Sequence, residues 1–75
     1  MPLDTMLRTV RAETAAEQRR ADDLAGTVTA LFGAGGDTSE AERELFDVLD
    51  GLALLRMREH AIEVMWAFAP ATAEA

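Results

Sequence analysis

The sequence predicts an all-α protein, an antiparallel two-helix hairpin that self-associates, most simply into a four-helix bundle. Two long stretches carry apolar residues at helical spacing, one glycine-rich cluster separates them, and no segment alternates as a strand does. We expect a helix over about 3–32, a turn over 33–38, a helix over about 39–69 and a frayed tail over 70–75. With 75 residues, these elements make up a single domain.

The first predicted helix has one seam of residues at coiled-coil spacing. Its members follow one another in alternating steps of four and three, the spacing with which one helix packs along another. The seam consists of Leu3, Leu7, Val10, Thr14, Glu17, Ala21, Leu24, Val28 and Leu31. It is apolar at both ends and weaker in the middle, and we expect it to face the second helix.

The second predicted helix is apolar on two sides. With 100° per residue, its first half places one stripe on one side, made of Leu45, Phe46, Val48, Leu49, Leu52 and Ala53. In its second half the apolar residues cover the opposite side, namely Leu54, Leu55, Met57, Ala61, Ile62, Val64, Met65, Trp66 and Phe68. Either a kink at Gly51 turns the same face inward, or the second half contacts other chains. We favour the second interpretation, because a monomer would expose a large apolar patch.

This pattern predicts a small, non-catalytic interaction protein, a regulator or accessory subunit. Domains of this size usually need disulfides, a metal or a partner for stability, and the chain has no cysteine. The expected partner is the chain itself, as a homodimer or higher oligomer, or a larger protein. The expected interface anchors are Leu55, Met57, Ile62, Met65, Trp66 and Phe68. Interhelical ion pairs that set the register are expected at Glu17, Arg56, Glu59 and Glu63.

A first alternative is a ferritin-like metal-binding oligomer. Glu59, His60 and Glu63 are spaced so that they can converge on one strip of a helix, and carboxylates with histidine bind iron or another divalent metal in helical bundles. Ferritin-like sites place a glutamate three residues before the histidine, and here Met57 occupies that position. The leading interpretation therefore includes no cofactor.

A second alternative is an acidic decoy or inhibitor that binds a basic protein surface. The segment from Asp37 to Asp50 has six acidic residues and one arginine, which gives a charge of −5. The whole chain has a net charge of −7, which argues against nucleic-acid binding. Without Cys, Lys or Tyr, and with one His and one Ser, it offers no catalytic arrangement. We see no signal peptide and no membrane-spanning run, so we expect a cytoplasmic protein.

Overall fold

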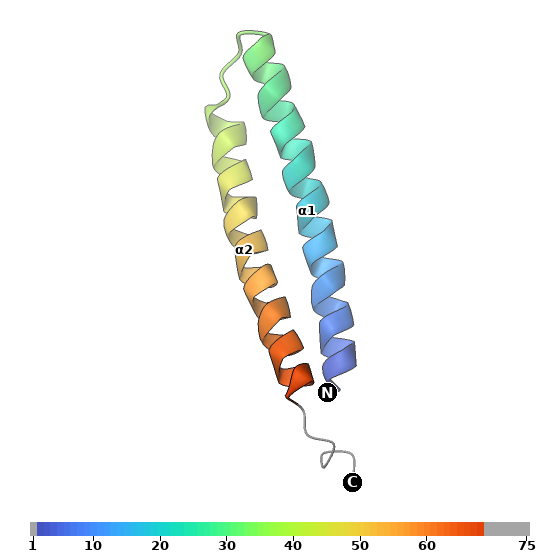
Figure 1. Ribbon diagram of the computed structural model, residues 1–75. Coiled ribbons are helices and arrows are strands. Elements are labelled where there is room, and N and C mark those ends of the chain that lie inside the picture. Colours follow the sequence, from blue (N-terminus) through green and yellow to red (C-terminus); the bar gives the residue numbers. More distant parts are fainter. Residues whose placement is uncertain (1, 69–75) are drawn as a thin grey trace.

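The computed structural model describes residues 2–68 and confirms an all-α, antiparallel two-helix hairpin (Figure 1). Helix α1 spans Leu3–Gly33 and helix α2 spans Ser39–Ala67. Each helix is rich in Ala, Leu and Arg, residues with high helix propensity. The N-terminus of α1 and the end of α2 lie at the same end of the rod. The expected tail over 70–75, and the predicted end of the second helix at 69, lie outside the described residues.

The two helices pack along one inner seam. All nine predicted seam residues of α1 are buried or half-buried, so that part of the prediction is confirmed. On α2 the inner seam follows the same four-three spacing, through Ala41, Leu45, Val48, Leu52, Leu55, Glu59 and Ile62, and each of these is buried or half-buried. Within residues 2–68, the fully buried side chains are Val10, Ala21, Val48, Leu52 and Ile62. The hairpin therefore has a narrow core, a single line of contacts between two helices.

The turn after α1 depends on one glycine. Gly35 has φ +73°, a left-handed conformation that glycine adopts without steric cost. The Gly36 N–H donates to the Leu31 carbonyl at 2.8 Å, and the Gly35 N–H donates to the Phe32 carbonyl at 3.1 Å. These two bonds form a Schellman motif, which satisfies the last carbonyl groups of α1 and reverses the chain.

Side-chain contacts other than a capping box stabilise the start of α2. Thr38 occupies the N-cap position with helical dihedral angles and makes no side-chain cap bond. Instead, the Ser39 N–H donates to the Asp37 carboxylate at 2.9 Å, and the Thr38 hydroxyl donates to Glu42 at 2.8 Å. The bond from the Ser39 backbone, helped by the Ser39 hydroxyl, lowers the pKa of Asp37 below its usual value. Asp37 thus stays ionised and accepts one of the free N–H groups at the helix start.

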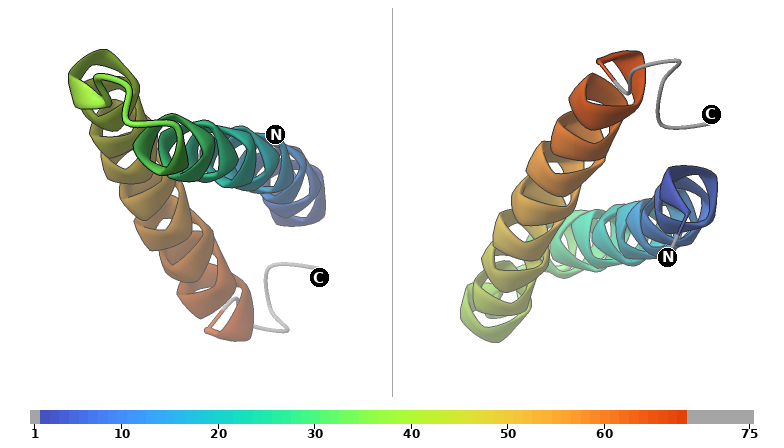
Figure 2. Two further views of the ribbon diagram at one scale, coloured as in Figure 1. Left: turned by 90° about the horizontal axis from the view of Figure 1, so that it is seen from above. Right: turned by 90° about the horizontal axis from the view of Figure 1, so that it is seen from below.

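Helix α2 continues without interruption through Gly51. Seen along the rod, the two helices are inclined to one another, as expected for helices that pack through a four-three seam (Figure 2). The apolar residues of the second half of α2 are therefore displayed by a continuous helix. α1 covers one side of that helix, and within the described hairpin no other element covers the opposite side.

We predict that replacing Leu52 by alanine strongly destabilises the hairpin. Leu52 is 2% exposed, and a buried Leu→Ala change removes about 2–5 kcal/mol from the free energy of unfolding. The matched control is Leu49→Ala, because Leu49 lies one turn away and is 41% exposed. Urea denaturation followed by circular dichroism measures both. Equal losses in the two variants would contradict the assigned core.

Candidate interaction surface

The side of α2 that faces away from α1 carries an unpartnered apolar stripe. We define the outer face as Leu54, Met57, Ala61, Val64, Met65 and Phe68. Without Met65, its members follow one another in steps of three and four, as in a coiled-coil seam. The five large side chains of the outer face are between 40% and 80% exposed. Monomeric proteins rarely leave so many neighbouring large apolar side chains in water.

The structure divides the six predicted anchors between two sides of α2. Met57, Met65 and Phe68 lie exposed on the outer face. Ile62 is buried and Leu55 is half-buried on the inner seam, so both contribute to the hairpin itself. Leu54 and Val64 complete the outer face, although they were not among the predicted anchors. Their position in the three-four spacing with Met57 was the signal that could have identified them.

Trp66 continues the inner seam at the end of the rod, four residues after Ile62. It is 49% exposed and lines a shallow notch at the end of the rod, together with Asp4, Leu7, Arg8 and Arg11 of α1. Its indole therefore covers the end of the inner seam and leaves about half of its area for another contact. This position is compatible with the predicted anchor role, and it gives Trp66 a part in the hairpin as well.

Polar contacts join the two helices at several places in residues 2–68. Arg11 Nε lies 3.8 Å from Glu59 Oε2, and Arg20 lies 3.6 Å from Glu44. Arg56 donates a hydrogen bond to Gln18, the neighbour of Glu17, where an ion pair was expected. The two ion pairs are largely exposed, so they contribute about 0–1 kcal/mol each. Glu63 lies exposed on α2.

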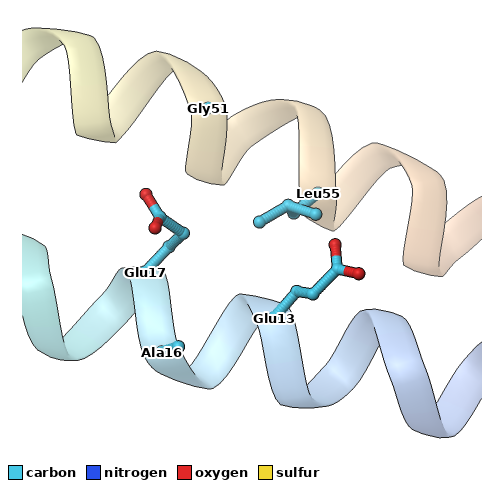
Figure 3. Close-up of a pocket in the computed structure, with 5 residues that line it drawn as sticks. All are labelled: Glu13, Ala16, Glu17, Gly51 and Leu55. Atoms are coloured by element: carbon cyan, nitrogen blue, oxygen red, sulfur yellow. The ribbon is translucent and has the colours of Figure 1, made fainter.

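Glu17 is a charged residue within the apolar seam. The carboxylates of Glu13 and Glu17 project from α1 toward α2, where Gly51 and Leu55 line the same open notch (Figure 3). A Cβ atom added at Gly51 would meet nothing within 4 Å, so the glycine leaves space at this level. Glu17 is half-buried, and the ion pairs that the structure records in residues 2–68 involve other residues. The hairpin therefore has an open notch beside Glu17, next to the buried Leu52.

The three residues of the metal alternative do not form a site within one chain. Glu59 is directed to Arg11, whereas His60 and Glu63 are exposed. In the described part of the chain, no group of three His, Cys, Asp or Glu side chains is arranged to hold a metal ion. In the same residues, neither helix is long and apolar enough to cross a membrane.

Charge is unevenly distributed along the rod. The turn half, residues 16–53, contains nine acidic residues and three arginines, a net charge of −6. The terminal half, residues 2–15 and 54–68, contains four acidic residues and four arginines, a net charge of zero. The acidic segment from Asp37 to Asp50 belongs to the turn half, and the outer face belongs to the neutral half. The net negative charge is thus carried by the turn half, which also exposes Phe32 and Phe46, and the outer face lies in the half without net charge.

We predict that Glu17→Leu stabilises the hairpin by about 1 kcal/mol, since it extends the apolar seam at a half-buried position. The control Glu63→Leu removes the same charge from an exposed position and should change the free energy of unfolding by less than about 0.5 kcal/mol. Thermal and urea denaturation at low protein concentration measure both. A loss of stability in Glu17→Leu would mean that the carboxylate has a stabilising partner.

No family model, curated protein or solved structure matches this chain.

Proposed function

We propose that this chain is a small, non-catalytic interaction protein, a regulator or accessory subunit, whose binding surface is the outer face of α2. The observation that carries the proposal is the row of five large apolar side chains, 40% to 80% exposed, on one side of a continuous helix. A second helix laid along this row would bury it through the same spacing that joins α1 to α2.

The surroundings of the outer face support a protein partner. The stripe is long and narrow, as helix–helix contacts are, and polar residues such as Arg58 and His60 border it. Met57 and Met65 have unbranched, adaptable side chains that fit apolar contact surfaces well. Phe68, 80% exposed, supplies aromatic area of the kind that dominates binding energy at many interfaces.

The core of the hairpin gives a further argument. A single line of buried residues between two helices is a small source of stability for a domain of this size. A protein that binds through the outer face gains a second line of buried residues along α2. Binding and folding would then stabilise one another.

Site-specific photo-crosslinking tests the proposal in the cells that produce the protein. A photoreactive phenylalanine analogue replaces Met57 on the outer face, and the control places it at Ala16, an exposed position of α1. We expect a discrete protein adduct from position 57 and none from position 16. Adding Val64→Glu should reduce the adduct at least tenfold, because it places a charge on the apolar stripe.

Two results would contradict the proposed surface. One is no protein adduct from position 57, neither with another protein nor with a second copy. The other is an identical set of adducts from positions 57 and 16, which would indicate random collision.

A further inference from the structure

We infer that the occupant of the outer face is a second copy of this chain, packed antiparallel about a two-fold axis near residue 59, so that the two copies overlap through residues 50–68 of α2. The acidic turn halves then project from opposite ends of the dimer. This inference rests on the proposed function, since it names the partner of the same surface.

The residue pattern of the outer face is suited to antiparallel pairing with itself. The four positions Leu54, Met57, Ala61 and Val64 are separated by steps of three, four and three, which read the same in both directions. In an antiparallel pair, the four positions of one copy can therefore lie opposite the same four positions of the other. Met57 then lies opposite Ala61 of the second copy, and Leu54 lies opposite its Val64. Because a large side chain faces a small one at Met57 and Ala61, the two stripes can interdigitate. A two-fold axis between these positions makes both halves of the contact identical.

The exposed area of the outer face reaches the lower end of the range for specific interfaces. Its five large side chains are on average about 60% exposed. With roughly 200 Å² for each residue, they present about 600 Å². Specific interfaces bury about 1,200–2,000 Å² in total, or at least about 600 Å² from each partner. The outer face therefore supplies one side of a small specific interface.

The charge distribution selects the orientation. A parallel dimer would place two turn halves, each with a net charge of −6, side by side along α2. In the antiparallel overlap, the midpoints of the two turn halves lie about 50 Å apart, given 1.5 Å per helical residue. This separation is several times the Debye length of about 10 Å at 0.1 M salt, so their repulsion is screened. The overlap itself contains the neutral half, and Arg58 at its edge is exposed and long enough to keep its charge in water.

Two measurements on the purified full chain test this inference. Sedimentation equilibrium between about 1 µM and about 1 mM covers the range of ordinary dimer affinities and should show a monomer–dimer equilibrium. Because the chain has no cysteine, single nitroxide labels can be attached through Arg43→Cys in the turn half or His60→Cys in the overlap. Electron–electron distance measurements should then give about 50 Å between the labels at position 43 and less than about 20 Å at position 60.

Variants with matched controls connect the dimer to the outer face. Met57→Glu should weaken dimerisation at least 100-fold while the helical circular dichroism spectrum is retained, because position 57 is exposed in the hairpin. Ala16→Glu adds the same charge to an exposed position of α1 and should leave dimerisation within a factor of about three.

The outcomes separate the inference from the proposed function. A chain that is monomeric up to about 1 mM overturns the second copy as occupant. If position 57 still crosslinks to a different protein, the outer face stands as the binding surface with another partner. Labels at position 43 closer than about 25 Å would overturn the antiparallel orientation, because that distance requires the turn halves to lie together.

Discussion

Helix α2 has apolar residues on two opposite sides, and the hairpin provides one covering helix. Because α1 can cover only one side of α2, the other apolar side is left exposed. The inner seam, with Val48, Leu52 and Ile62 fully buried, uses α1 as its partner. The outer face, centred on Met57 and Val64, has no partner within the described hairpin. The four-three spacing of the inner seam recurs on the outer face, which supports the proposal that another helix packs there.

The distribution of charge follows the same division. Acidic residues are concentrated around the turn, where the start of α2 also favours negative charge through its dipole. The terminal half, which carries the outer face, has equal numbers of acidic residues and arginines. The proposed contact surface thus lies in the half of the rod where repulsion between copies is smallest. The acidic half limits where and in which orientation another acidic chain can approach.

The fold could be predicted well from the sequence, because the strongest local signals agree with one another. The seam of α1 has a constant spacing, and the glycines around Gly35 mark the single reversal of the chain. The sides of α2 were harder to assign. Counting 100° per residue makes a seven-residue repeat drift by about 20° per heptad, whereas the packed helices follow the repeat itself. Leu55 and Ile62 therefore seemed to rotate away from α1, although they continue the inner seam.

The candidate surface could be predicted in part for a related reason. Periodicity shows that a helix has a second apolar side, and the exposed positions of Met57, Met65 and Phe68 agree with that expectation. Periodicity alone does not say which residues the first partner already covers. The polar contacts between the helices show the same limit. Arg56 donates a hydrogen bond to Gln18, whereas the sequence indicated an interhelical contact at the neighbouring Glu17. Which of two neighbouring residues a side chain contacts depends on how far that side chain extends between two inclined helices.

The most direct test of the central claim is the rate at which peroxide oxidises Met57 in the intact protein. The outer face is proposed to be covered, whereas the isolated hairpin leaves Met57 67% exposed. Mass spectrometry after brief oxidation reports this rate at increasing protein concentration and in cell extract. The account predicts that Met57 becomes protected under both conditions, relative to dilute protein. Oxidation of Met57 at the dilute rate under all conditions would show that the outer face stays open to solvent, and would contradict the account.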